Sequence, residues 1–321
     1  MALLNTLEHY MATTKKTGQW PELVYIDLKD TLQTVHLWTQ IVGKIRLSKT
    51  PWINHGWHVT LYVSARGLST GTIPYENGSF QIDFDFISHA LLIYASDGGQ
   101  KRIALGPGNI AAFYHELFDA LTALNIDVKI HGKPNELEVA VPFNKDVSQR
   151  NYDKVQMQKY WQALVRIDAV FTRFRASFNG KCSPVHFFWG AFDLAVTRFS
   201  GRTAPQHSGG APNLPDRVMQ EAYSHEVSSA GFWGGGDAYP FPAFYSYCYP
   251  AQEEFGDQPV QPEKAFYSKE MGEFLLNYED VQRAEDPEAA LLSFLQTTYT
   301  AAAKTGNWNP DLNCNLTSFE K

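Results

Sequence analysis

Apolar residues recur at helical spacing in four parts of the chain. Steps of three and four residues predict a helix that begins after Asp30 and ends at Gly43, and a second helix that begins after the cap residue Asn109. The longest such pattern predicts a helix over residues 152–178. Asp286, followed by a proline, predicts the start of a final helix. These four helices are spread over the whole chain.

Alternating apolar and polar positions predict strands between the helices, because successive side chains of a strand point to opposite faces. Asn77-Gly78 is a strong hairpin signal between two of these strands. The predicted strands cover residues 57–63, 73–75, 80–86, 89–95, 127–130, 138–141, 185–199, 219–230 and 241–249. The pattern therefore predicts an α+β fold, with antiparallel sheet flanked by long helices.

The order of helices and strands leaves two domain organisations open. A long helix, a Gly-Lys pair and strands occur twice, with the pairs at Gly43-Lys44 and Gly180-Lys181. This repetition predicts two similar α-β4-α halves, 1–146 and 147–321, divided near Lys145. The alternative is one continuous domain.

Composition and charge exclude several classes of protein. The chain is 44% hydrophobic and 14% aromatic, which predicts a folded protein with a large core. Its net charge of −7 is concentrated in residues 250–321, which hold 13 acidic and 5 basic side chains. A near-neutral body with an acidic end argues against nucleic-acid binding, which requires many cations.

Sequence signals predict a cytoplasmic protein without a nucleotide cofactor. We find no apolar stretch long enough to cross a bilayer, so no membrane partner is expected. Cys182, Cys248 and Cys314 are odd in number and widely spaced, which favours a reducing compartment. Neither GxxxxGK[ST] nor GxGxxG follows a predicted strand, and the GxSxG motif of hydrolases does not occur.

Several segments carry a family resemblance. The most distinctive is GKCSPVHFFWGAFDLAVTRFSGR at residues 180–202; the others are QIVGKIRL at 40–47, NHGWHVTLYVSARGL at 54–68, EAYSHE at 221–226 and GFWGGG at 231–236. Together they resemble a bacterial protein family of unknown function, over almost the whole chain. The resemblance implies a bacterial, stand-alone protein. It implies no activity, so the chemistry depends on individual residues.

Glu221 and His225 are the candidate acid–base pair. They are four residues apart, which places them on one face of residues 219–230 in either a strand or a helix. A carboxylate can fix the tautomer of a histidine that acts as a general base near neutral pH. His186 is a candidate for a second polar contact in the same catalytic site.

Cations and aromatic rings predict a ligand site in the same region. Six cations lie beside glycines or at strand ends, as expected of residues that bind an anion: Lys44, Arg46, Arg66, Lys181, Arg198 and Arg202. Trp189 and Trp233 are candidates for contact with an apolar part of the ligand. Tyr245 is among the other aromatic residues that are expected either to line a pocket or to pack in the core. Asp193, in an apolar strand, requires a cationic partner and is either part of a buried ion pair or a ligand contact.

Histidines leave a metal site open. His55, His58 and His186 are candidate ligands for zinc, iron or manganese. The residue four positions after His225 is Ser229, so the HExxH motif of metalloproteases is absent. The sequence therefore neither requires nor excludes a divalent metal.

These observations favour an enzyme that acts on a small, anionic, partly apolar molecule. The predicted chemistry is His/Glu acid–base catalysis or a metal-assisted reaction, and hydrolysis is one reaction class that fits either. The alternative is a non-catalytic small-molecule-binding protein with the same pocket. A third hypothesis is a protein-interaction scaffold that uses the acidic residues 250–321.

Overall fold

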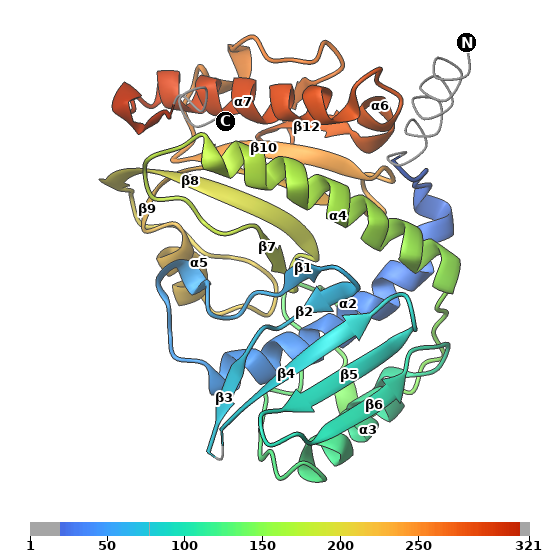
Figure 1. Ribbon diagram of the computed structural model, residues 1–321. Coiled ribbons are helices and arrows are strands. Elements are labelled where there is room, and N and C mark those ends of the chain that lie inside the picture. Colours follow the sequence, from blue (N-terminus) through green and yellow to red (C-terminus); the bar gives the residue numbers. More distant parts are fainter. Residues whose placement is uncertain (1–19, 77, 315–321) are drawn as a thin grey trace, which may run out of the picture.

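The protein contains two antiparallel sheets and several long helices, which confirms the predicted α+β fold. The computed structural model describes residues 20–76 and 78–314. Each sheet has six strands. Figure 1 shows one sheet in the first half of the chain and the other in the second half, with α2 running beside both. The described part of the chain contains no helix that is both long and apolar enough to cross a membrane.

The first sheet is an antiparallel meander that follows α2 and precedes α3 in the chain. Its strand order is β1-β2-β4-β5-β6, and β3 pairs with β4. The elements are α2 (Tyr25–Lys49), β1 (Tyr62–Ser64), β2 (Gly67–Ser69), β3 (Ile73–Tyr75), β4 (Gly78–Asp85), β5 (Ala90–Ala95), β6 (Gln100–Ala104) and α3 (Ile110–Thr122).

Two local predictions in this half are confirmed. Tyr75 pairs with Gly78 in a tight hairpin between β3 and β4, as the Asn77-Gly78 signal predicted, although Asn77 itself lies outside the described residues. The side chain of Asn109 accepts a hydrogen bond of 2.8 Å from the backbone N–H of Ala112 and so caps α3.

The second sheet has the order β11-β12-β10-β9-β8-β7. Asp286 caps α7 by accepting a hydrogen bond from the backbone N–H of Ala289, as predicted. The elements are α4 (Lys154–Ala176), β7 (His186–Phe188), β8 (Asp193–Thr203), α5 (Asp216–Ala222), β9 (His225–Trp233), β10 (Ala243–Tyr249), β11 (Phe266–Ser268), β12 (Glu273–Asn277), α6 (Tyr278–Gln282) and α7 (Pro287–Thr305). Short 3₁₀ turns occur at Asn54–Gly56, Phe143–Lys145, Phe255–Asp257 and Pro310–Leu312.

The prediction that α2 ends at Gly43 is wrong. The helix begins at Tyr25 and continues through Gly43 to Lys49. The glycine serves a packing role, because a Cβ atom at Gly43 would lie only 2.2 Å from the indole of Trp189. The missing side chain lets the Trp189 ring lie directly against the helix backbone.

Four strand predictions are also wrong. Residues 185–199 form a hairpin of β7 and β8, with a turn in which Phe192 has a φ of 61°. Residues 219–230 are divided between α5 and β9. Residues 127–130 and 138–141 contain no strand. Between them, the backbone N–H of Glu136 donates a hydrogen bond of 2.7 Å to the carbonyl of Pro212, which lies in a loop. Tertiary contacts outweigh local propensity in these segments.

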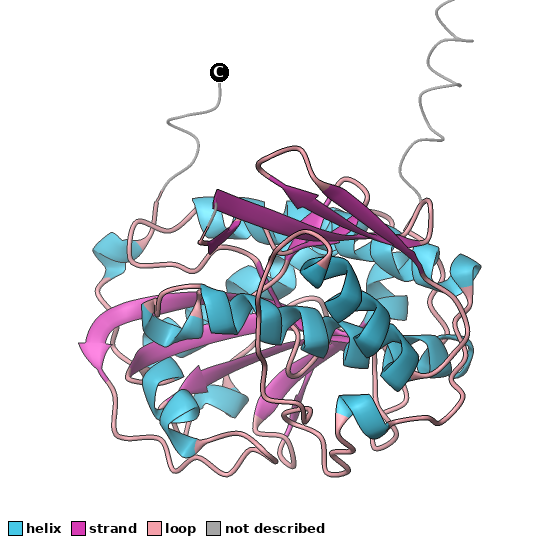
Figure 2. Cartoon of the chain, turned by 90° about the horizontal axis from the view of Figure 1, so that it is seen from below, coloured by secondary structure: helices cyan, strands magenta, loops and turns pink. Residues whose placement is uncertain are grey.

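One hydrophobic core connects the two halves of the chain. Buried residues of both sheets and of α2, α3, α4 and α7 form a single cluster. Leu61 and Phe187 also exchange two backbone hydrogen bonds, of 2.8 and 2.9 Å, between the start of the first sheet and the edge of the second. Figure 2 shows the helices between and around the strands from below. The similarity of the halves and a boundary near Lys145 stay predictions.

The second sheet has two different faces. Leu194, Val196 and Arg198 of β8 are buried on the face that packs against α4 and α7. Asp193, Ala195 and the other alternating residues of β8 point to the opposite face. Figure 1 shows α4 and α7 lying along this sheet. The face opposite these two helices carries the cavity described below.

Arg198 links these helices to the sheet. Its side chain is fully buried, and its guanidinium lies 3.5 Å from the ring centroid of Phe174 and 4.3 Å from that of Tyr299. It donates hydrogen bonds to the carbonyl of Phe174 and, at 2.8 Å, to the hydroxyl of Ser177. The guanidinium therefore joins the end of α4 to α7 through cation–π and hydrogen-bond contacts.

Substituting Arg198→Met should lower the free energy of unfolding by about 2 kcal/mol, because the change removes the cation–π contacts and leaves buried acceptors unpaired. Urea denaturation measures the difference. Arg202→Met, at a half-exposed ion pair, is the matched control and should cost less than about 1 kcal/mol. Equal losses in the two variants would contradict the structural role of Arg198.

Candidate functional site

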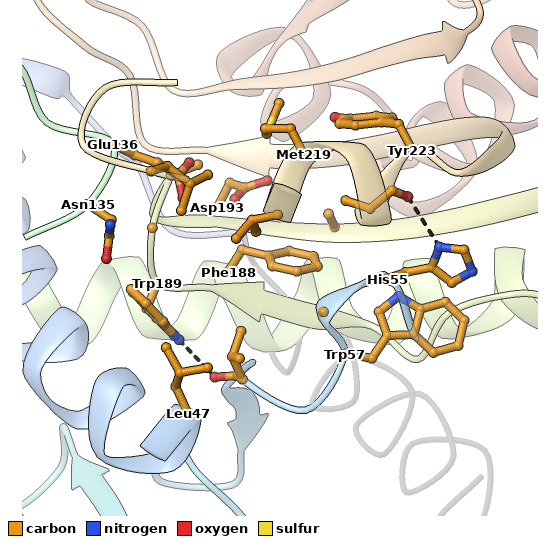
Figure 3. Close-up of a pocket in the computed structure, with 18 of the residues that line it drawn as sticks. Leu47, His55, Trp57, Asn135, Glu136, Phe188, Trp189, Asp193, Met219 and Tyr223 are labelled. Carbon is orange, nitrogen blue, oxygen red and sulfur yellow. Dashed lines mark hydrogen bonds between the residues drawn. The ribbon is translucent and has the colours of Figure 1, made fainter. Parts of the chain in front are cut away.

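A cavity of about 630 Å³ lies against the face of the second sheet opposite α4 and α7. Its wall is made by β7 to β10, and it is completed by α2, the 50–59 segment, the 131–136 loop and α5. Figure 3 shows Glu136, Asp193 and Asn135 at one end of the cavity and His55, Trp57 and Tyr223 at the other. Most of the lining is aromatic or aliphatic, so a few polar groups define its chemistry.

Asp193 is the polar group of the sheet wall. Its side chain is buried at the start of β8, and the hydroxyl of Tyr245 donates a hydrogen bond to its carboxylate. A Cβ atom at Gly231 would lie 2.2 Å from the Tyr245 hydroxyl. Gly231, opposite Tyr245 in the ladder, therefore leaves the space that the tyrosine crosses to reach Asp193.

The 135–136 loop brings a second carboxyl to the same end. Gln40 of α2 exchanges two hydrogen bonds with the backbone of Asn135, of 2.7 and 2.8 Å. Glu136 has a φ of 59°, and its carboxyl group lies directly against Gly190, where a Cβ atom would be 1.9 Å from Oε1. Helix α2 and the turn after β7 thus hold Glu136 in the cavity.

Lys44 is the cation of this end. It is 3% exposed, lies 5.6 Å from the ring centroid of Trp189 and donates a hydrogen bond to the side-chain oxygen of Asn135. The Trp189 indole in turn donates to the carbonyl of Val59 at 2.8 Å. Lys44 and Trp189 are therefore fixed relative to each other on the α2 side of the cavity.

Burial changes the pKa of all three ionisable groups. Desolvation raises the pKa of Asp193 to about 6, although the hydrogen bond from Tyr245 opposes the change. Desolvation and the charge of Asp193 raise the pKa of Glu136 to about 7. Desolvation lowers the pKa of Lys44 to about 8, and the charge of Glu136 limits that decrease. Proton exchange near neutral pH is therefore available at this end of the cavity.

The predicted Glu221–His225 pair is wrong in its geometry. Glu221 lies on α5 and His225 on β9, so the two residues do not share the face of one element. The Glu221 carboxylate accepts a hydrogen bond of 3.2 Å from the backbone N–H of His55. The His225 ring lies edge-on to the His55 ring, with centroids 5.5 Å apart. Both residues that the spacing had paired therefore contact His55, and no hydrogen bond between them occurs among the described residues.

His55 and Lys181 form a polar group at the other end of the cavity, where His55 is part of the lining. The His55 Nδ1 atom lies 3.3 Å from the carbonyl oxygens of both Glu221 and Ala222, so Nδ1 carries the proton. Its Nε2 atom then accepts a hydrogen bond from Lys181 Nζ at 2.6 Å. Desolvation and the charge of Lys181 lower the pKa of His55. The pair is held by contacts within the protein.

His186 lies beside the cavity and is fully buried. Its ring centroid is 5.6 Å from that of Tyr62 and 5.5 Å from that of Phe188. Neither ring nitrogen has a hydrogen-bond partner among the described residues. Desolvation, together with the charge of Arg46, lowers the pKa of His186 to about 3. The imidazole is thus neutral at pH 7, and a catalytic role for it stays a prediction.

The predicted anion-binding arginines do not meet at the cavity. Arg198 points to the opposite face of β8, into the core between α4 and α7. Arg202 pairs with Glu226 at 2.7 Å and donates to backbone carbonyls near the end of α7. Arg198 points away from the cavity because side chains alternate along β8, and the guanidinium of Arg202 is already paired with Glu226. Anion binding by these arginines therefore gains no support from their placement.

The two predicted tryptophans have different positions. Trp189 lines the cavity, as does Asp193, whereas Trp233 is not part of the lining. Trp233 pairs with Asp193 across the sheet, and its ring lies 5.7 Å from that of Tyr239. Ligand contact at any of these positions stays a prediction.

No group of three or more His, Cys, Asp or Glu residues in the described segments is arranged to hold a metal ion. His55 and His58 both line the cavity, but the His58 ring packs on Trp52 with centroids 4.7 Å apart. His186 faces other aromatic rings. The candidate metal ligands are therefore not gathered at one point.

Sequence reasoning missed one residue of the polar end, Glu136. Lys44 is one of the basic residues that the sequence predicts as anion contacts, and it lines this end of the cavity. Tyr245 belongs to an aromatic strand in which alternate residues share a face. Glu136 has no signal, because the contacts that place it come from α2, Pro212 and Gly190.

Comparison with known proteins gives one match. The model of a family of unknown function, DUF5996, matches residues 20–314. No curated protein and no solved structure matches the chain. The match covers both sheets and the whole cavity, but it carries no information on activity.

Substituting Asp193→Asn should stabilise the protein at pH 8. The pKa of Asp193 is higher in the folded protein than the usual value near 3.8, so folding binds a proton. The stability from that proton is complete below about pH 4 and is lost as the pH rises through about 6. Because asparagine still accepts from Tyr245, we expect a gain of about 2 kcal/mol at pH 8 and almost none at pH 4.

Urea denaturation at both pH values tests this expectation. Asp127→Asn, at an exposed position, is the matched control and should change stability little at either pH. A gain that does not depend on pH would show that the Asp193 carboxyl has an ordinary pKa.

Proposed function

The chain belongs to the DUF5996 family of unknown function, and we propose from its cavity that it binds a small molecule with an apolar body. The observation that carries this proposal is a largely apolar cavity of about 630 Å³ with ionisable groups gathered at one end. Ligand sites in proteins have this size and this distribution of polar groups.

The lining supports one orientation for the ligand. Phe188, Met219 and Trp57 offer apolar surface along the cavity and at the His55 end (Figure 3). Asp193, Glu136 and Lys44 can contact a polar group at the opposite end. The sequence favoured an anionic molecule held by arginines. The cavity instead favours a ligand whose polar end can lie beside the carboxyl groups of Asp193 and Glu136.

Filling the cavity should abolish binding. We expect the neutral dye N-phenyl-1-naphthylamine to bind the protein with a saturable rise in fluorescence, because its rings match the apolar lining. Ala195→Phe and, separately, Ala222→Phe place a ring in the cavity and should weaken binding at least about tenfold. Fluorescence titration measures the affinity, and circular dichroism confirms the fold.

Ala123→Phe is the matched control, since this alanine is exposed at the end of α3. It should leave dye binding unchanged. Absence of saturable binding, or equal binding by the filled and control variants, would refute the proposal.

A second function, acid–base catalysis, is favoured by the two carboxyl groups. Near pH 7 Glu136 is partly protonated and Asp193 is mostly ionised, because their pKa values are about 7 and 6. Such a pair can donate and accept protons in one site. This assignment replaces the predicted pair Glu221 and His225, and it does not depend on a metal.

Hydrolysis of a panel of small p-nitrophenyl esters tests the catalytic function. We expect Glu136→Gln and Asp193→Asn to lower kcat at least about 100-fold, and His225→Asn to have little effect. The opposite pattern would favour the acid–base role predicted for His225. No hydrolysis by the wild-type protein would leave no support for an esterase.

The remaining properties stay predictions from the sequence. They are a cytoplasmic location and the lack of a nucleic-acid partner and of a nucleotide cofactor.

A further inference from the structure

We propose that Lys44 forms a covalent imine with an aldehyde or ketone ligand in the cavity. This inference rests on the proposed function, because the ligand must first enter the cavity. It adds the chemical class of the ligand and the residue that reacts with it.

The surroundings of Lys44 suit a neutral amine better than an ammonium ion. Lys44 is buried in α2 and lines the cavity, yet its only hydrogen bond within the described residues goes to the side chain of Asn135. No carboxylate oxygen of these residues lies within 4.0 Å of its Nζ atom. An ammonium ion has three donors to satisfy, and burying it with one acceptor is unfavourable.

Neutral lysine is a nucleophile, and burial increases its population. A pKa lowered from 10.5 to about 8 raises the neutral fraction at pH 7 from about 0.03% to about 10%. Desolvated lysines of this kind form Schiff bases with carbonyl compounds. The apolar lining around Lys44 and Trp189 therefore favours the reactive form.

Glu136 can supply the proton that the reaction requires. The neutral Lys44 amine attacks the carbonyl carbon: a C–N bond forms, the π bond of the carbonyl breaks, and a proton moves from nitrogen to oxygen to give a carbinolamine. The carboxylic acid of Glu136 then protonates the hydroxyl group, the C–O bond breaks and water leaves. The products are an iminium ion, the Glu136 carboxylate as its counterion, and water.

A carbonyl group fits this end better than a carboxylate does. Asp193 and Glu136 would repel an anion placed beside Lys44, and Glu273 adds a third carboxyl close enough to feel the charge of Asp193. A neutral carbonyl avoids that repulsion. Lys181, the other lysine near the cavity, is exposed and donates to His55, so its amine is already engaged.

Reductive trapping tests the proposal. The full chain is incubated at pH 7.5 with 2-naphthaldehyde and sodium cyanoborohydride, which reduces an imine to a stable secondary amine. Peptide mass spectrometry should find one naphthylmethyl group per chain, on Lys44, formed at least about tenfold faster than on any other lysine. Excess 2-naphthylmethanol, which lacks the carbonyl, should slow labelling by competing for the cavity.

Variants assign the roles. Lys44→Met should abolish this adduct, whereas Lys101→Met, at an exposed position on β6, should leave it unchanged. Glu136→Gln should slow trapping about 100-fold while N-phenyl-1-naphthylamine still binds. The competition by 2-naphthylmethanol needs only the wild-type protein, so the test stands even where a variant fails to fold.

The outcomes separate the two proposals. Dye binding without preferential labelling of Lys44 would overturn the imine and leave the small-molecule function intact. Labelling of Lys181 in place of Lys44 would also overturn the imine. Displacement of the dye by 2-naphthoate, without any adduct on Lys44, would overturn it as well and make Lys44 an anion contact. Failure of both dye binding and labelling would refute the cavity as a ligand site.

Discussion

The close contact between α2 and the turn that joins β7 to β8 is the constraint on which the cavity depends. The Trp189 ring lies against the backbone of Gly43, and His36 Nε2 lies 2.8 Å from the carbonyl of Gly190. Because a carbonyl can only accept, this nitrogen carries the proton of a neutral imidazole. Burial lowers the pKa of His36 to about 4 and so keeps the ring in this state. The contact fixes the wall to which Lys44 and Glu136 belong.

The second sheet uses its two faces for different purposes. Apolar side chains and Arg198 secure α4 and α7 on one face, so that face is filled. On the other face, Gly231 and Ala195 have little or no side chain and leave space next to the sheet. The Tyr245 ring occupies the part of this space over Gly231, where its hydroxyl reaches Asp193. Alternation along the strands thus separates structural residues from those available for a ligand.

One end of the cavity holds ionisable groups that are poorly matched to their surroundings. Asp193 and Glu136 lose hydration and repel each other, and the lysine beside them has one acceptor. Groups of this kind lower the stability of the folded protein, and they concentrate at functional sites. Their arrangement connects the binding of an apolar molecule with proton transfer and carbonyl chemistry in one place.

Local patterns determined much of the secondary structure. Helical spacing over 152–178, the caps Asn109 and Asp286 and the Asn77-Gly78 hairpin depend on interactions between near neighbours, and the described residues bear them out. The same patterns also identified the α+β class, since amphipathic helices and alternating strands require a shared core.

Tertiary structure alone decided the candidate site. Glu221 and His225 were paired by spacing, but a turn from α5 into β9 separated them. Arg198 was selected for its charge, but the strand register turned it into the core. Glu136 had no local signal, because its position results from contacts with residues far away in the sequence. Burial and long-range contacts set the protonation of these groups, and neither is encoded within a short segment.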